Sequence, residues 1–273
     1  MENPTGKLSM VFRKKESGKT YLAEQYFKLP LQIMNPYYQD KDGTAFIYML
    51  NPSGGILQHD RLLTEIKLEK NTKVLVTTPS STKFYKMDEG YARLENYMTL
   101  EEEAVLEYLP EYNTPFAESN TEQENIFRLK KSSILIASEM VTAGRISRGE
   151  SFKFERYDSK TKIYVDDQLL VYDSSLIEPG KTQVSTMGLM EKFSTVGTMY
   201  VYKEGLPKGL IEEINQITLG NEIKLGATQI EQDIMIVRIM GVGAQDMQEA
   251  MLEIWNIIRR TILNKGGVRI RKY

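Results

Sequence analysis

Apolar and polar positions alternate along most of the first 180 residues. In TEIKLE (64–69) Ile66 and Leu68 alternate with charged residues, and in KVLVTT (73–78) Val74 and Val76 share one face. Four more stretches follow the same rule: ARLENYMTLE (92–101), NIFRLKK (125–131), SFKFERY (151–157) and TKIYVDD (161–167). Each run is short and bounded by Gly, Asn, Asp or Pro. This pattern predicts many short strands with one buried face.

The pattern changes beyond residue 205. From Pro207, the stretch PKGLIEEINQI (207–217) repeats apolar residues at helical spacing and predicts a short helix. DIMIVRIM (233–240) predicts a strand. AQDMQEAMLEIWNIIRRTIL (244–263) carries an apolar stripe at steps of three or four, and Gly266 suits a helix stop. Packing of this stripe on the chain's own sheet is favoured over a partner helix, with the sole tryptophan, Trp255, in the core or at an interface.

Strands first and helices last favour an α+β or mainly-β layered fold. Residues 132–138 (SSILIAS) are apolar on both faces and are expected to be a strand buried on both. The stretch 174–188 is expected to be a connection within one domain, so residues 1–273 are treated as a single domain. Hydrophobic residues at 41% and charged residues at 26% are typical of a globular chain.

The net charge and the absence of cysteine limit the classes of partner and of metal site that the chain could have. Thirty-five Lys and Arg against 37 Asp and Glu give a net charge of -2, which favours neither nucleic acid nor an anionic membrane. Cysteine is absent, which fits a reducing compartment and excludes disulfides and thiolate metal sites. No signal-peptide region or membrane-spanning apolar run is present, so a cytoplasmic protein is expected.

The usual catalytic patterns are absent. The chain has one histidine, His59, and no G-x-S-x-G elbow for nucleophilic catalysis. The glycines in NPSGGILQHD (51–60) match neither phosphate-binding pattern, and GVGAQD (241–246) is expected to be a strand-to-helix turn. TTPSSTKFYK (77–86) carries hydroxyls and Lys83, which suit phosphate or the end of a strand; the structural interpretation is favoured.

Metal chemistry is restricted to weak binding. With one His and no Cys, a permanent zinc or nickel centre is not expected from this chain alone. Carboxylates bind nickel loosely, which suits transfer better than storage. The candidates are Asp60, Glu107, Glu139, Glu150, Asp166 and Asp173, whereas Glu101 to Glu103 are expected to form a solvated turn.

Four motifs occur in an order that resembles one family, the UreD (also called UreH) urease accessory proteins. The first two are the family's P-P-G-G-I-V-x-G-D-x-L, here NPSGGILQHDRL, and T-x-x-x-T/S-K-x-Y-R, here TPSSTKFYK. The next two are L-E-W-L-P-Q, here LEYLPE, and G-R-x-x-x-G-E-x-F, here GRISRGESF. The matched positions include Gly54, Gly55, Asp60, Thr82, Lys83, Glu107, Pro110, Arg145, Gly149 and Glu150. The resemblance runs from about residue 8 to the end and includes VDDQLLV around Asp166 and Trp255.

The resemblance implies a fold and a role. Family members have a mainly-β, β-helix-like layered structure with two helices, which agrees with the strand and helix patterns. They are not enzymes; they are scaffolds for GTP-dependent nickel insertion into urease, acting with UreF, the GTPase UreG and the urease apoprotein. The resemblance implies Ni²⁺ in transit, no tightly bound cofactor, and a dimer of heterodimers with UreF.

The resemblance also implies a nickel path, carried over as Asp60, Thr82, Lys83, Glu139 and Glu150. His59, which the family lacks, is a candidate nitrogen donor beside Asp60 for transient metal binding. Three departures bear on it. His59 replaces the usual glycine, a family E-R pair falls on Tyr172 and Asp173 so that its carboxylate is displaced or lost, and the C-terminal R-I-W ends in Arg271.

Two other functions stay open as alternatives. A hydrolase or transferase would need a pocket with a perturbed acid or base. A carbohydrate- or protein-binding module on a β scaffold is permitted by the 16 tyrosines. For residues 52–55 the expectation is a turn in which glycine supplies a positive φ or a close backbone approach.

Overall fold

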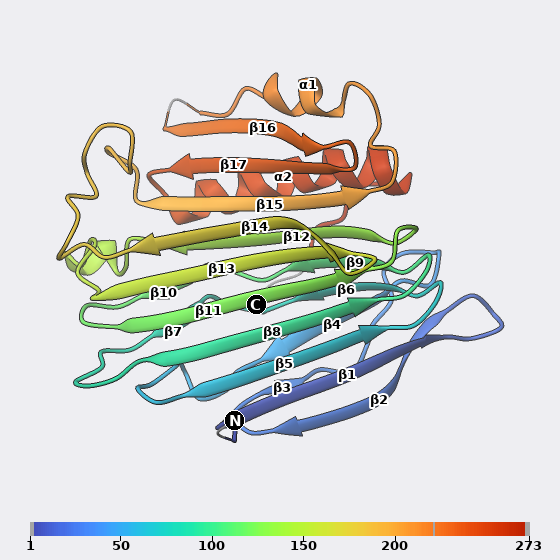
Figure 1. The fold of residues 1–273 in the computed structure, drawn as a ribbon, viewed down its shortest axis with the longest axis horizontal. Coiled ribbons are helices and arrows are strands. Elements are labelled where there is room, and N and C mark those ends of the chain that lie inside the picture. Colours follow the sequence, from blue (N-terminus) through green and yellow to red (C-terminus); the bar gives the residue numbers. More distant parts are fainter. Residues whose placement is uncertain (1–2, 221, 271–273) are drawn as a thin grey trace.

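The computed structural model describes residues 3–220 and 222–270. Two β-sheets lie face to face, and two helices cover the outer face of the second sheet at one end (Figure 1). The first sheet contains, in spatial order, β14 (Gln168–Ile177), β13 (Arg156–Val165), β11 (Asn120–Leu129), β8 (Ala92–Leu100), β5 (Arg61–Leu68), β1 (Gly6–Lys14) and β2 (Thr20–Lys28).

The second sheet follows the order β16 (Ile223–Glu231), β17 (Ile234–Gly241), β15 (Thr195–Lys203), β12 (Ile134–Thr142), β9 (Val105–Leu109), β6 (Lys73–Thr77), β4 (Ala45–Leu50) and β3 (Gln32–Ile33). Two short strands, β7 (Thr82–Phe84) and β10 (Asn113–Pro115), join it through β12. The sheet extends past β14, so β15, β17 and β16 have no strand of the first sheet in front of them (Figure 1).

The centre of the molecule is a stack of parallel strands. Between β5 and β13 the main strands alternate between the two sheets, and each lies parallel to the previous strand of its own sheet. Antiparallel pairs occur only toward the ends of the described sheets, for example β1 with β2 and β13 with β14. This arrangement is β-solenoid-like and confirms the prediction of a layered, mainly-β fold with two helices near the C-terminus.

Alternation in the sequence builds the core between the sheets. Inward positions such as Ile66, Leu68, Val74 and Val76 are buried there, as the period-two pattern predicts. Each fully buried Leu, Ile or Met contributes roughly 1.5–3 kcal/mol relative to exposure.

A second core lies between the second sheet and the helices α1 (Leu210–Asn215) and α2 (Ala244–Leu263). The apolar stripe of α2 packs on the chain's own sheet, with Trp255 only 1% exposed. Helix α2 has the predicted bounds and ends at Asn264 in the left-handed conformation. Strand β12 is buried on both faces, as predicted for residues 132–138, although it begins at Ile134.

Several boundaries differ from the predictions. The predicted strand 151–157 is wrong for residues 151–155, since β13 begins at Arg156 and Phe152 adopts a positive φ of 51°. Residues 174–177 belong to β14, so the connection starts only at Glu178. Helix α1 is shorter than the predicted 207–217. The sequence pattern does not predict the strands β1, β2, β4, β9, β14, β15 and β16 or the short strands β3, β7 and β10.

The turn predicted at residues 52–55 is present. Asp166 and Asp167, predicted as the end of a strand, instead take positive φ in the tight turn between β13 and β14. Gly54 supplies a positive φ of 82°, and Gly55 a close approach, because an added Cβ would lie 2.2 Å from the Tyr85 ring. No helix of the described residues is long and apolar enough to cross a membrane.

Candidate functional site: a polar seam between the sheets

A row of polar side chains crosses the inner face of the first sheet. Strand pairing aligns Thr64 with Asn96, Asn96 with Asn125, Asn125 with Thr161, and Thr161 with Asp173. Asn96 Nδ2 donates to Asn125 Oδ1 at 2.9 Å, and Asn125 Nδ2 lies 3.4 Å from Thr161 Oγ1. Parallel, in-register strands place equivalent positions side by side, so one polar position in each strand becomes a continuous ladder.

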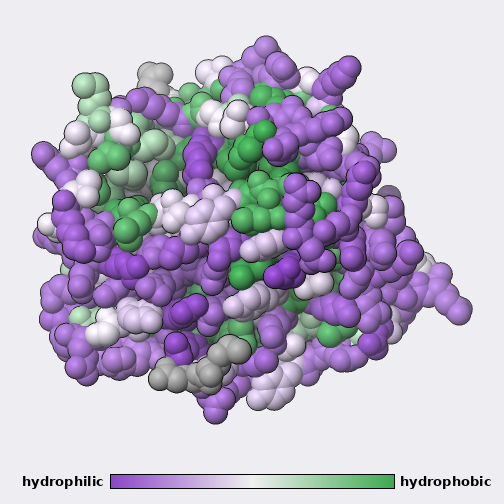
Figure 2. Space-filling view, viewed as in Figure 1, coloured by the Kyte–Doolittle hydropathy of each residue, from purple (hydrophilic) through white to green (hydrophobic). Residues whose placement is uncertain are grey.

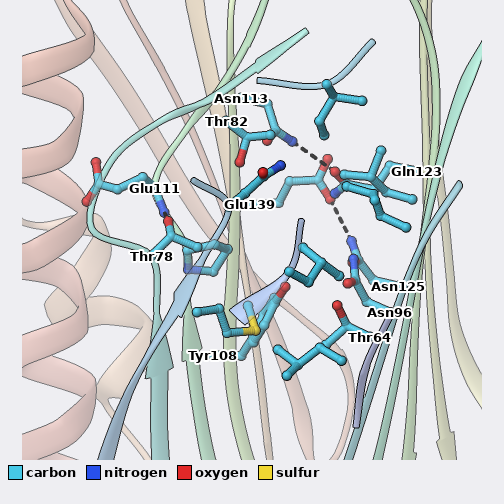
Figure 3. Close-up of a pocket in the computed structure, with 18 of the residues that line it drawn as sticks. Thr64, Thr78, Thr82, Asn96, Tyr108, Glu111, Asn113, Gln123, Asn125 and Glu139 are labelled. Carbon is cyan, nitrogen blue, oxygen red and sulfur yellow. Dashed lines mark hydrogen bonds between the residues drawn. The ribbon is translucent and has the colours of Figure 1, made fainter. Parts of the chain in front are cut away.

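Glu139 reaches this ladder from the opposite sheet. It lies on β12 and accepts hydrogen bonds from Asn125 Nδ2 at 3.0 Å and from the Tyr157 hydroxyl at 3.2 Å. Asn113 Nδ2 extends the network by donating to Gln123 Oε1 at 2.9 Å (Figure 3) and to Tyr157 Oη at 2.7 Å. Within the described chain, no Lys or Arg forms an ion pair with Glu139.

The environment of Glu139 determines its charge state. Burial raises the pKa of the Glu139 carboxyl, and the nearby negative charge of Asp173 raises it further. Burial also raises the pKa of Tyr157 well above its ordinary value, so that hydroxyl stays a neutral donor. A carboxylate removed from water that accepts hydrogen bonds only from neutral donors has no positive charge to compensate it, and it therefore attracts a mobile cation.

Two cavities meet at Glu139. The first, of about 100 Å³, lies between the sheets, and its polar lining residues are Asn51, Thr64, Thr78, Thr82, Asn96, Tyr108, Glu111, Asn113, Gln123, Asn125, Ser138 and Glu139 (Figure 3). The second, of about 90 Å³, is lined by Glu139, Tyr157, Ser159, Thr161, Asp173, Ser175, Thr198, Tyr200 and Arg238 with two valines. Glu139 is the residue that lines both cavities.

A third cavity, of about 50 Å³, adjoins the first on the side of α2. The two share Pro110, Glu111, Ser138 and Met140. The sheet is open here because β9 pairs with β12 only as far as Ala137, and β10 takes over at Val141. The three adjoining cavities therefore present Glu111, Glu139 and Asp173 in succession from the helix side to the far side of the seam.

The residues carried over for a nickel path do not all lie on this seam. Thr82 and Glu139 line the first cavity. Asp60 does not, because its Oδ2 accepts from the Leu57 backbone N–H at 2.8 Å and its Oδ1 from the Thr5 hydroxyl at 3.3 Å. It holds the loop that precedes β5.

Lys83 and His59 are exposed at the end of the sheets. Lys83 lies on β7, next to Thr82, with an exposed side chain. His59 has a positive φ of 63° and lies 3.7 Å from Glu89. Neither residue lines any of the three cavities.

Glu150 ties a loop together. Arg145 donates two hydrogen bonds to Glu150, one from Nε to Oε2 at 2.8 Å and one from Nη2 to Oε1. The hydrogen bonds from Arg145 hold the pKa of Glu150 below its usual value. Arg145 also lies over the Phe116 ring at 4.0 Å, and Gly149 ends the 3-10 turn Ile146–Arg148 with φ 73°.

Glu107 anchors α2. Its carboxylate accepts from Trp255 Nε1 at 2.8 Å and from Arg259 Nε at 3.1 Å, and all three side chains are buried. Burial raises the pKa of Glu107, while the charge of Arg259 opposes that shift. Arg259 also pairs with Asp40, so the network joins the helix, β9 and the loop before β4.

The other two candidate carboxylates differ in position. Asp166 lies in the β13–β14 turn. Asp173, whose carboxylate the sequence treats as displaced or lost, points into the second cavity and is held by Tyr200 and Arg238. It is therefore an inward-facing carboxylate. The departure at Arg271 lies outside the described residues.

The described residues contain no cluster of three or more His, Asp or Glu that could hold a metal ion. Oxygen ligands arranged singly along a seam bind a divalent ion weakly. The sequence analysis missed the amides and hydroxyls of the seam, chiefly Asn96, Asn113, Gln123, Asn125 and Tyr157. The signal was available: in NTEQENIFRL (120–129) the inward positions change from polar to apolar halfway along the strand.

The comparisons with known proteins agree across the chain. The family model described as UreD urease accessory protein matches residues 4–272. A protein of Lachnoclostridium phytofermentans named urease accessory protein UreD is 30% identical over 275 residues, covering 100% of both chains. A Bacillus cereus protein of the same name is 30% identical over 274 residues with the same coverage, and one of Acetivibrio thermocellus is 28% identical over 94% of this chain and all of its own.

Proposed function

Since the chain belongs to the UreD family of urease accessory proteins, we propose that it is a non-enzymatic scaffold for GTP-dependent insertion of nickel into the urease active site. In this proposal it acts in the cytoplasm, bound to UreF, UreG and the urease apoprotein, as a dimer of heterodimers with UreF. Nickel is its cargo, and no cofactor is bound tightly.

The observation that carries the proposal is the position of Glu139. Its partly buried carboxylate has no cationic partner among the described residues and lines two polar cavities. A cation placed there recovers much of the electrostatic energy that burial costs. One carboxylate with neutral amide and hydroxyl neighbours is too poor a ligand set to retain nickel, so the ion can move on.

The seam supplies the rest of the path. Glu111 lines both the cavity beside α2 and the first inter-sheet cavity, so an ion entering from the helix side meets it first. Between Glu111 and Glu139, the amide oxygens and hydroxyls of the ladder replace water in the ion's shell. Asp173 then lies on the far side of Glu139. Thr82 contributes a hydroxyl to the first cavity, whereas Asp60 and Glu150 support the path by holding loops.

The test replaces Glu139 by Gln, which keeps the shape and removes the charge. In cells that carry the urease operon, Glu139→Gln should lower nickel per urease and urease activity together, while the amount of urease protein stays constant. The matched control is Glu65→Gln, a half-exposed carboxylate on the outer face that pairs with Lys7. Co-purification of UreF and urease with each variant separates a path defect from a binding defect.

Two results would count against the proposal. If Glu139→Gln loads urease as fully as the native chain, the seam is not the nickel path. If deletion of the gene leaves urease activity and nickel unchanged, this chain has no role in metallocentre assembly.

A further inference from the structure

The far side of the second cavity carries a single positive charge. Among the described residues that line the three cavities, Arg238 is the one Lys or Arg side chain. Its Nη2 donates to Asp173 Oδ2 at 2.7 Å, and its Nη1 donates to Thr198 Oγ1 at 3.1 Å. The Tyr200 hydroxyl donates to the same Asp173 oxygen at 2.6 Å.

The two partners differ in exposure. The Arg238 side chain is 56% exposed, whereas that of Asp173 is 15% exposed. The guanidinium therefore lies at the solvent end of the cavity and the carboxylate lies inside it. Figure 2 shows the surrounding face, where apolar side chains gather in the upper half, over the region in which β14 adjoins the uncovered strands of the second sheet.

This geometry places the positively charged Arg238 guanidinium in the route that a divalent ion would take out of the second cavity. A divalent ion moving outward from Glu139 has Asp173 as its next carboxylate, but that carboxylate already has a counterion. To bind there, the ion must displace the guanidinium, and its own charge is repelled by the guanidinium as it approaches. Exposed ion pairs of this kind are weak, so Arg238 can swing into solvent without disturbing the fold. Tyr200 still holds Asp173 when the arginine leaves.

We propose that Arg238 is a displaceable counterion that closes the solvent mouth of the second cavity, so that a divalent cation in the seam is retained until Arg238 moves away from Asp173. This inference rests on the proposed function, because it assumes that the seam carries the ion. It adds a gate to that path. The gate acts on charge, so it slows the exit of any cation from the seam and keeps the cargo from reaching chelating ligands in the surrounding water.

The test uses the assembled accessory complex, urease apoprotein, GTP and nickel, with and without EDTA added after the complex has been loaded. Arg238→Gln should cause a several-fold fall in the ratio of urease activated with EDTA to urease activated without it. Arg238→Lys, which keeps the charge, should restore much of that ratio. The control Arg128→Gln alters a similarly exposed arginine, paired with Asp167, that lines none of the cavities.

Glu139→Gln is run in parallel to separate the two proposals. If Glu139→Gln stops delivery while Arg238→Gln and the native chain have equal EDTA ratios, the gate is wrong and the path stands. If Glu139→Gln delivers normally, the path and the gate are both overturned. Thermal unfolding of each variant confirms that it is folded, and a fall in the Arg238→Gln ratio that Arg238→Lys does not reverse also contradicts the gate.

Discussion

At the scale of single residues, the ionised Glu139 carboxyl lowers the stability of the fold, and the same charge serves the proposed nickel path. Glu139 is partly buried among neutral hydrogen-bond donors, and its removal from water raises the pKa of its carboxyl. The folded protein therefore favours the protonated form more than the unfolded chain does. The ionised carboxyl destabilises the fold above the raised pKa, and this cost disappears as the pH falls through that pKa.

Glu139→Gln should consequently raise the melting temperature at neutral pH. The difference from the native chain should shrink on acidification, at pH values above the range in which an ordinary glutamate protonates. Melting curves across a pH series measure it, with Glu65→Gln as the exposed control. A constant difference at all pH values would show that the gain comes from something other than the charge.

At the scale of secondary structure elements, the attachment of α2 depends on a buried charge network. Arg259 is 0% exposed and pairs with Glu107 and Asp40, whereas the next residue, Arg260, is 64% exposed and lies 3.5 Å from Glu213. Breaking a buried pair leaves the partner charge uncompensated, which costs far more than losing an exposed pair.

Arg259→Met should therefore lower the free energy of unfolding by about 3–5 kcal/mol. Arg260→Met, on the same turn of the helix, should cost less than about 1 kcal/mol. Urea unfolding followed by circular dichroism compares them. Equal effects of the two substitutions would mean that α2 is held by its apolar stripe alone.

Elements also differ in how far the sequence predicts them. Helix α2 was predictable to its ends because its apolar stripe is long and its termination is local. The alternating strands were predictable because burial of one face leaves an apolar residue at every second position. Residues 151–155 were not, because Phe152 and Phe154 belong to a third cluster at the end of the sheets, and their spacing imitates a strand. The edge strands β2 and β16 are largely exposed and leave a weak pattern, whereas β15 is buried almost throughout and therefore does not alternate.

At the scale of the whole molecule, the seam could not be read from the sequence. Glu139 was found through motif resemblance, but its partners come from strands far apart in the chain and meet only through parallel pairing. Register between strands is set by the assembled core, so a ladder such as Asn96, Asn125 and Thr161 becomes visible once the strands are aligned. The same motifs suggested Asp60, which the fold uses in a turn.

Among the residues that the structure describes, no strand pairs with the outer edge of β2 or of β14, the two edge strands of the first sheet. Strand β2 forms one edge and carries Tyr26 and Phe27, which are 57% and 48% exposed. Exposed edge strands with apolar side chains promote pairing between molecules, and a net charge of only -2 provides little repulsion. We therefore expect the isolated chain to self-associate, increasingly so as the pH falls from neutral toward its isoelectric point.

Phe27→Glu should reduce this association by replacing an apolar contact with a charge. Gln25→Glu is the matched control, because residue 25 is exposed on the same face of β2 and the substitution adds the same charge without removing an apolar side chain. Light scattering coupled to size-exclusion chromatography over a pH series distinguishes them. If the two variants dissociate equally, net charge controls the association and the apolar side chains of β2 do not. If the native chain is monomeric at every pH, β2 does not mediate self-association.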